Sequence, residues 1–318
     1  GRRMHIRPAA SGTHTVSDGN SVLESEPPQV RTLTLVCDLF SPHKGQVNLG
    51  KLAEKFSIKK SGNGIIGLSC QYKTDEGEEK VVVRGKVKDA KRHFAHQAQL
   101  RLSLPGSPNI SVKVFSTGRL QIAGCREEAI GASAVRCVAE GVNEVMETDS
   151  SVIQRQTTAP HNPGAPVRGP LDLDTLPKAS IVMINCSFDA GFERLGFGLN
   201  PVKLTEILRQ EHLRNPHIEE VSYTPELHYT GVKIKYKTTI TDPNSTGEAP
   251  SAPKKEVFIG IFPSGKAVIT GASAWTEVES AYGFVQRMLS TSYEAIKVPL
   301  SEMRPAKKQP RKADPPCA

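Results

Sequence analysis

Residues 256–271 read EVFIGIFPSGKAVITG and have the pattern of a β-hairpin. In the first arm Val257, Ile259 and Ile261 share one face, because successive side chains of a strand point to opposite faces. Pro263-Ser264-Gly265 predicts a tight turn, and the residues after it alternate again. The stretch therefore predicts two antiparallel strands joined by a short turn.

A related stretch lies earlier in the chain, at residues 109–124, which read NISVKVFSTGRLQIAG. Phe115-Ser-Thr-Gly-Arg119 in this stretch corresponds to Phe262-Pro-Ser-Gly-Lys266 in the later one. The two copies are too far apart for a solenoid, whose repeats are roughly 20–50 residues long. The pattern therefore predicts one duplicated unit and a chain of two related halves.

These motifs carry a resemblance to a known family. Phe-x-Ser-Gly-Lys, followed by alternating apolar residues and Thr-Gly-Ala, resembles the strand pair in each half of the TATA-box-binding protein family. Upstream, Tyr223-Thr-Pro-Glu-Leu-His-Tyr-Thr-Gly231 is similar to the Pro-Glu-Leu segment of the family's second half. The resemblance covers residues 30–146 and 179–298.

The composition is that of a globular protein that is able to bind nucleic acid. The 318 residues suffice for two lobes, and 37% hydrophobic with 23% charged residues is ordinary for a globular chain. A net charge of +8 permits nucleic-acid binding without requiring it. No apolar run has the length of a membrane span, and the first residues lack an apolar signal core. Six cysteines without a C-x-x-C pair favour reduced thiols over a disulfide framework or a zinc site.

The order of the predicted elements favours the α+β class. In each half a strand is followed by a short helix, then by antiparallel strands, then by a long helix, at residues 126–146 and 275–289. The predicted segments are a disordered start at 1–29, a first repeat at 30–147 with a long insertion at 74–108, a linker at 148–178, a second repeat at 179–299, and a basic Pro/Lys tail at 300–318.

The resemblance implies the shape of a saddle. In the family, two pseudo-symmetric repeats share one curved antiparallel sheet, with helices on the convex face and DNA on the bare concave face. Apolar side chains wedge between base steps of the minor groove, and the bent duplex contacts more of the protein. We therefore expect a concave face with apolar residues toward the bases and cations toward the phosphates.

The family has two wedge residues in each half. Phe115 and Phe262 correspond to one of them, and Ile65 and Tyr229, or its neighbour His228, correspond to the other. In a reading without the resemblance, Phe115 and Phe262 pack beneath their hairpin turns. Both alternatives stay open at this point.

The remaining candidates follow from strand alternation and the resemblance. Arg119 and Lys266 correspond to the cation after each turn glycine, and none of the candidates is acidic. The family has an asparagine at the centre of the saddle in each half, and the corresponding residues of this chain are Thr32 and Ile181. The loss of both asparagines argues against the family's preference for TATA sequences. The DNA-binding set is Ile65, Gln71, Lys113, Phe115, Arg119, Tyr229, Lys233, Lys235, Phe258, Phe262, Lys266, Val268 and Thr270.

The resemblance implies a transcription initiation factor that binds and bends duplex DNA. Glu226 and Leu227 correspond to the family's contact with the general transcription factor that recruits RNA polymerase. The alternative is a related fold that has lost sequence-specific DNA binding and acts as a protein-interaction scaffold. Glycine loops for nucleotides, His-Glu-x-x-His and nucleophile elbows are absent from the sequence, so we expect no enzyme, cofactor or metal site. The expected location is the nucleus, a viral factory or a virion.

Overall fold

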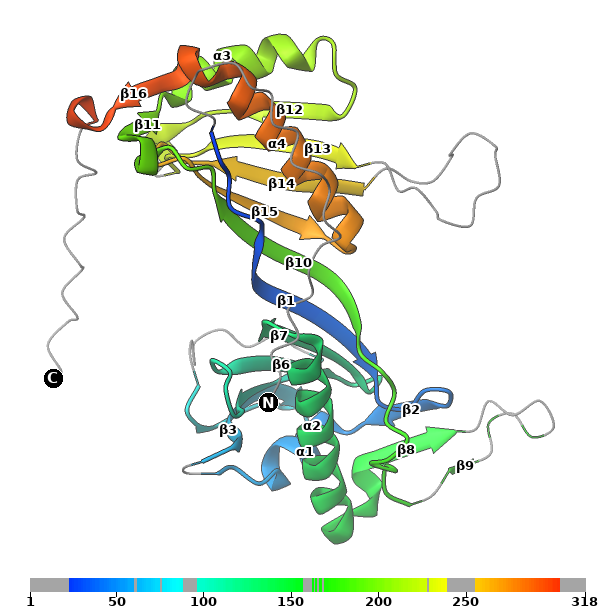
Figure 1. Cartoon of the computed structure of the whole chain (residues 1–318). Coiled ribbons are helices and arrows are strands. Elements are labelled where there is room, and N and C mark those ends of the chain that lie inside the picture. The colour runs from blue at the N-terminus through cyan, green and yellow to red at the C-terminus, as the bar shows by residue number, and fades with distance from the viewer. Residues whose placement is uncertain are drawn as a thin grey trace, which may run out of the picture.

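One eleven-stranded antiparallel sheet is the framework of a mixed α+β fold (Figure 1). The computed structural model describes residues 23–303, apart from 60–61, 75, 88–95, 157–161, 163, 165, 168, 228 and 239–254. The strands of the sheet are β1 (Gln29–Asp38), β3 (Gly64–Lys73), β4 (Glu79–Gly85), β5 (Gln97–Ser103), β6 (Ile110–Phe115), β7 (Arg119–Cys125), β10 (Ser180–Asp189), β12 (Ile218–Ser222), β13 (Val232–Thr238), β14 (Lys255–Ile261) and β15 (Lys266–Ala272). Their order across the sheet is β12-β13-β14-β15-β10-β1-β7-β6-β5-β3-β4.

Four α-helices of the described residues pack against the buried face of this sheet. They are α1 (Leu49–Lys55), α2 (Glu128–Thr148), α3 (Pro201–His212) and α4 (Trp275–Ile296). Figure 1 shows α1 and α2 beside one end of the sheet and α3 and α4 beside the other. Two small sheets lie at the periphery, one of β2 (Lys44–Val47), β8 (Ile153–Gln156) and β9 (Pro166–Val167), the other of β11 (Phe197–Leu199) and β16 (Lys297–Pro299).

Strands β1 and β10 join the two ends of the large sheet. They pair in antiparallel fashion from Gln29 with Ser187 to Val36 with Ser180. We call β1, β3–β7, α1 and α2 the first half, and β10, β12–β15, α3 and α4 the second half. Outward from the centre the order is β7, β6, β5, β3 in the first half and β15, β14, β13, β12 in the second. Strand β4 is an additional edge strand of the first half.

The two hairpin turns have the same local geometry. Gly118 and Gly265 have φ values of 82° and 81°, a left-handed conformation that glycine adopts without strain. An added Cβ would lie 2.2 Å from the ring of Phe40 at Gly118, and 2.9 Å from Phe192 at Gly265. Both phenylalanines are buried, so the rings beneath the turns are these two rather than Phe115 and Phe262.

The long helices extend beyond their predicted ends. Helix α2 ends at Thr148, and α4 continues to Ile296 because Tyr293 and Ile296 extend its buried face. Helix α3 begins after Asn200, whose side chain accepts hydrogen bonds from the backbone N–H groups of the first turn.

Residues 74–108, which the sequence predicts to be a long insertion in the first repeat, contribute to the large sheet. They contain β4 and β5, and β5 lies between β3 and β6. Ala98, Leu100 and Leu102 of β5 are fully buried and alternate with polar residues. This alternation gives a half-buried strand that contains no continuous apolar run. Residues 88–95 lie outside the described residues.

The described parts of the predicted disordered start and linker are packed. The backbone N–H of Glu26 donates to the carbonyl oxygen of Asp189 at 2.8 Å, and the Tyr282 hydroxyl donates to the Glu26 carbonyl oxygen at 3.0 Å. Asn143 of α2 exchanges two hydrogen bonds with the backbone of Leu171, at 2.8 and 2.7 Å. Residues 1–22 and 304–318 lie outside the described residues.

We expect Gly118→Ala to destabilise the fold more than Gly106→Ala. Both glycines have positive φ, 82° and 69°, so alanine is strained at either position. Only at Gly118 does the added methyl also meet a buried ring, because nothing lies within 4 Å of it at Gly106. Urea unfolding should give free energies that differ by roughly 1–3 kcal/mol, the usual cost of overpacking. Equal free energies would contradict the packing of Phe40 beneath the turn.

Candidate nucleic-acid interface

The face of the large sheet opposite the helices, here called the open face, is only partly covered. In the second hairpin Phe258 pairs with Thr270 and Gly260 with Val268. Ile259 and Ile269, which lie between these pairs, are fully buried on the helix side. Because alternate residues point to opposite faces, the first four residues belong to the open face. This agrees with the sequence assignment of Phe258, Val268 and Thr270.

Three aromatic rings on the open face of the second half form what we call the aromatic cluster, Tyr229, Phe258 and Phe262. The ring centroid of Tyr229 lies 6.3 Å from that of Phe258 and 5.4 Å from that of Phe262. An added Cβ at Gly260 would lie 2.2 Å from the Tyr229 hydroxyl oxygen, so glycine makes room for the ring. Lys233 Nζ lies 4.5 Å from the Tyr229 centroid, a cation–π distance. Burial raises the pKa of the Tyr229 phenol.

The open face of the first half is more polar. Lys113 pairs with Gln99 on one side and with Gln121 on the other. Phe115, which ends β6, is partly exposed, in agreement with its assignment to this face. Gln71 lies nearer the sheet edge, where its Nε2 donates to Glu79 Oε2 at 3.2 Å.

The cation after each turn glycine lies beside an aspartate. Arg119 pairs with Asp38 and Lys266 with Asp189, and both cations are exposed. Each aspartate also accepts a hydrogen bond from the backbone N–H two residues further on, at 3.0 Å for Asp38 and 2.8 Å for Asp189. The open face therefore carries acidic residues that the sequence assignment left out.

Two lysines of β13 are held in ion pairs. Lys235 Nζ lies 2.7 Å from Glu220 Oε2, and Lys237 Nζ lies 3.0 Å from Glu219 Oε1. The hydrogen bond that Lys235 donates to Glu220 raises the pKa of Lys235. Exposed ion pairs of this kind are weak, so a phosphate group is able to compete for both lysines.

Ile65 does not lie on the open face, so its assignment to the DNA-binding set is wrong. It is 4% exposed, pairs with Leu102 and belongs to the hydrophobic core. A β-bulge between Ile65 and Gly67 interrupts the regular alternation of β3.

The correspondence between strands also differs from the one predicted. In the second half, Tyr229 precedes β13, and β13 pairs with the first hairpin strand, β14. In the first half, the strand that pairs with the first hairpin strand, β6, is β5 rather than β3, the strand of Ile65. Residues 88–95, which precede β5, and His228 lie outside the described residues.

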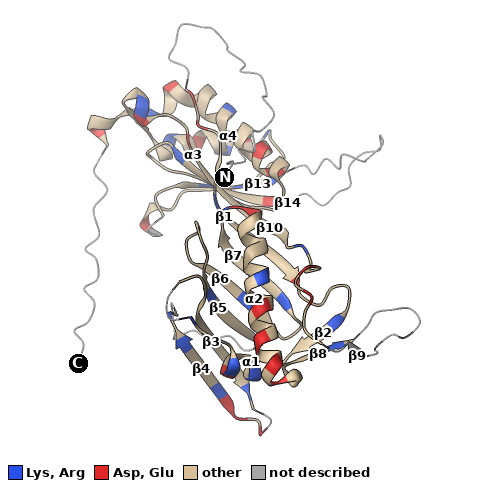
Figure 2. Ribbon diagram, turned by 60° about the horizontal axis from the view of Figure 1, so that its bottom comes forward, with Lys and Arg blue, Asp and Glu red and all other residues tan. Residues whose placement is uncertain are grey.

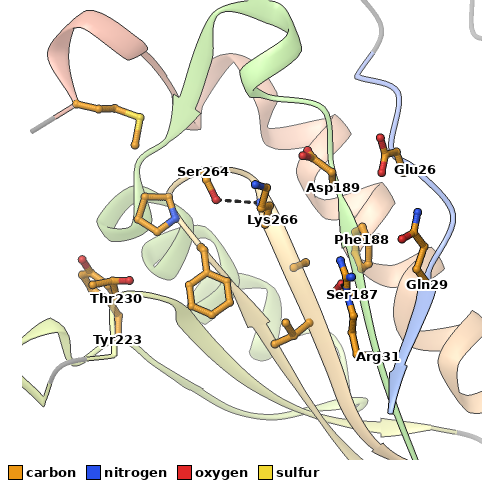
Figure 3. Close-up of a pocket in the computed structure, with 15 residues that line it drawn as sticks. Glu26, Gln29, Arg31, Ser187, Phe188, Asp189, Tyr223, Thr230, Ser264 and Lys266 are labelled. Carbon is orange, nitrogen blue, oxygen red and sulfur yellow. Dashed lines mark hydrogen bonds between the residues drawn. The ribbon is translucent and has the colours of Figure 1, made fainter. Parts of the chain in front are cut away.

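A hollow of about 730 Å³ lies on the open face beside the second hairpin turn (Figure 3). Phe262 and Val268 are among the residues that line it. Arg31 and Ser187 line it as well, and Arg31 Nε donates a hydrogen bond to Ser187 Oγ. Lys266 stands at its rim, so the hollow combines apolar, cationic and hydrogen-bonding groups.

The helix side of the first half carries exposed carboxylates. Glu140, Glu144 and Glu147 follow the outer surface of α2, and Figure 2 shows acidic residues along this helix. Their charge disfavours the approach of a phosphate backbone from that side. In the second half Glu226 is exposed in a short 3-10 turn, Pro225–Leu227.

Within the described ranges no group of histidine, cysteine, aspartate or glutamate side chains is placed to hold a metal ion. No helix in the same ranges is long and apolar enough to cross a membrane. The described cysteines are free, and burial raises the pKa of four thiols to about 11, those of Cys37, Cys70, Cys125 and Cys186.

The chain is similar to a protein named TATA-box-binding protein-like from Acanthamoeba polyphaga mimivirus. The two are 25% identical over 281 residues, which cover 85% of this chain and 67% of the relative. The resemblance to TATA-box-binding proteins is confirmed. A solved structure titled Methanococcus jannaschii TBP is 14% identical in sequence and superposes with a TM-score of 0.43. The superposition covers 84% of this chain and 99% of the chain of that structure. No family model matches the sequence.

We expect Tyr229→Ala to destabilise the protein, because the ring packs on Gly260, Phe258 and Phe262. Its removal should lower the free energy of urea unfolding by roughly 1–2 kcal/mol, the range for a lost aromatic contact with its buried area. Tyr229→Phe is the matched control and should unfold close to the wild type, since it keeps the ring. An alanine variant as stable as the wild type would show that the cluster is not packed.

Proposed function

We propose that the chain is a non-catalytic transcription initiation factor that binds and bends duplex DNA from the minor groove. The observation that carries this proposal is the aromatic cluster on a sheet face that none of the described helices covers. The three rings are only partly buried, and such rings are suited to contact with an apolar partner surface, which the faces and edges of bases supply. The similarity to a TATA-box-binding protein-like protein supports the same conclusion.

In this proposal the two halves are related repeats, and the large sheet curves as a saddle with the open face on its concave side. Phe262 enters a base step at one end of the site, and Phe115 enters a base step at the other. Tyr229 packs against Phe262 on one side and against Phe258 on the other, and Tyr229 and Phe258 cover the unstacked base. Contacts along the bent duplex offset the free energy that unstacking costs.

Cations at the margins of the open face supply the contacts to phosphate. Lys266 and Arg119 are exposed beside the wedge residues, and Lys233 lies over the Tyr229 ring. Gln71, Lys113, Lys235, Val268 and Thr270 complete the proposed contact surface. The neighbouring aspartates lower the net positive charge there, which favours a moderate affinity and a shallower dependence on salt.

The proposal includes protein partners. An exposed Glu226, together with Leu227 in the same turn, is a candidate contact for a general transcription factor that brings RNA polymerase. The corresponding site of action is the nucleus or a viral factory.

We expect the double change Arg119→Ala and Lys266→Ala to weaken binding to all duplex sequences alike. Each phosphate contact that is lost reduces the number of counterions released on binding. The slope of log affinity against log salt concentration should therefore flatten by roughly one to two units. Fluorescence anisotropy at several salt concentrations measures this slope. Arg136→Ala on α2 is the matched control, because it removes a cation from the helix side.

An unchanged slope in the double variant would contradict phosphate contact at the hairpin turns. A slope that also flattens in Arg136→Ala would mean that the helix side contributes to DNA binding.

We expect Phe262→Ala to reduce DNA bending far more than it reduces DNA binding. Energy transfer between dyes at the two ends of a duplex rises when the protein bends it, and this rise should be largely lost without the wedge ring. Phe262→Leu keeps an apolar wedge and should retain most of the bend. If the wild type binds duplex DNA without any change in energy transfer, bending is excluded and a scaffold role gains support.

A further inference from the structure

The two halves of the open face present different chemical groups at corresponding strand positions. In the second half a row across the sheet reads Lys233, Gly260, Val268 and Ser187. In the first half the row at the same distance from the turn reads Gln99, Lys113, Gln121 and Val36. The pair of Gly260 and Val268 in the second hairpin therefore corresponds to the pair of Lys113 and Gln121 in the first hairpin.

The next row repeats the contrast. Phe258 pairs with Thr270 in the second half, whereas Ser111 pairs with Ala123 in the first. Gln99 Nε2 donates a hydrogen bond to Ser111 Oγ at 3.4 Å, and this bond holds the Gln99 amide against the open face. A hollow of about 290 Å³ lies there, lined by residues that include Gln99, Arg101 and Ser111. The first half thus offers space and amide groups where the second half offers rings and a valine.

The minor groove distinguishes these two surfaces. A·T pairs present only hydrogen-bond acceptors there, whereas G·C pairs add the 2-amino group of guanine, a donor. An apolar surface leaves that donor without a partner after it has lost water, which is unfavourable. A glutamine carbonyl oxygen accepts a hydrogen bond from it, and the glutamine N–H groups donate to the acceptors of any base pair.

We propose that Gln99 and Gln121 set the base preference of the first half by accepting a hydrogen bond from the guanine 2-amino group. The first half then takes G·C pairs, which the aromatic cluster and Val268 exclude from the second half. This inference rests on the proposed minor-groove binding. Its consequence is that the protein lies in one orientation on a site with G·C pairs in one half and A·T pairs in the other.

The test uses the full chain and three duplexes of equal length. The first contains only A·T pairs in the site, the second has G·C pairs in one half, and the third has G·C pairs in both halves. The wild type should bind the first two with similar affinity and the third roughly tenfold more weakly or worse, the usual effect of wrong base pairs.

Two variants assign the preference to residues. Gln121→Met keeps the length of the side chain without its amide, and should lose roughly tenfold more affinity for the second duplex than for the first. Val268→Gln places an amide at the corresponding position of the second half, and should bring the third duplex close to the second. Circular dichroism melts of both variants check that the fold is intact.

The outcomes separate this inference from the proposed function. If G·C pairs in one half weaken the wild type as much as they weaken Gln121→Met, the glutamine assignment is overturned while DNA binding stands. The same holds if Val268→Gln has no effect on the third duplex. If the wild type binds none of the three duplexes, the proposed function itself is contradicted.

Discussion

The pairing of β1 with β10 is the constraint on which the rest of the structure depends. Without it the chain would be two separate sheets, each with an unpaired edge. The pairing places Leu33 opposite Ile184 on the helix side, and both are buried. Thr32 and Asn185 lie opposite each other, linked by a hydrogen bond of 2.9 Å. One register therefore gives both halves a common core side and a common open face.

Much of the fold follows from local sequence. The hairpins are predictable because Gly118 and Gly265 take a conformation that favours glycine, and the start of α3 because Asn200 and Pro201 are typical of a first turn. Strand β5 has the alternation of a half-buried strand, but only the tertiary structure shows that it lies between β3 and β6. The packing of the linker is not evident from its polar composition, because Leu171, which is buried and hydrogen-bonded to Asn143, has no sequence signal.

Part of the candidate site depends on contacts that sequence patterns do not contain. Alternation places Phe258 and Val268 correctly, but a β-bulge puts Ile65 in the core. The space above Gly260 that receives Tyr229 is set by tertiary packing and has no sequence signal of its own. The aspartates beside Arg119 and Lys266 come from strands distant in sequence, so only the sheet register reveals them.

The central claim is that the open face meets the minor groove of DNA. Replacing A·T pairs by inosine–cytosine pairs tests it directly, because inosine lacks the 2-amino group and presents an A·T-like minor groove with a G·C-like major groove. Affinity should be measured for an A·T duplex and for its inosine–cytosine counterpart. Equal affinities are the result expected for minor-groove binding. A large loss on the inosine–cytosine duplex would show that the protein reads the major groove and would contradict the claim.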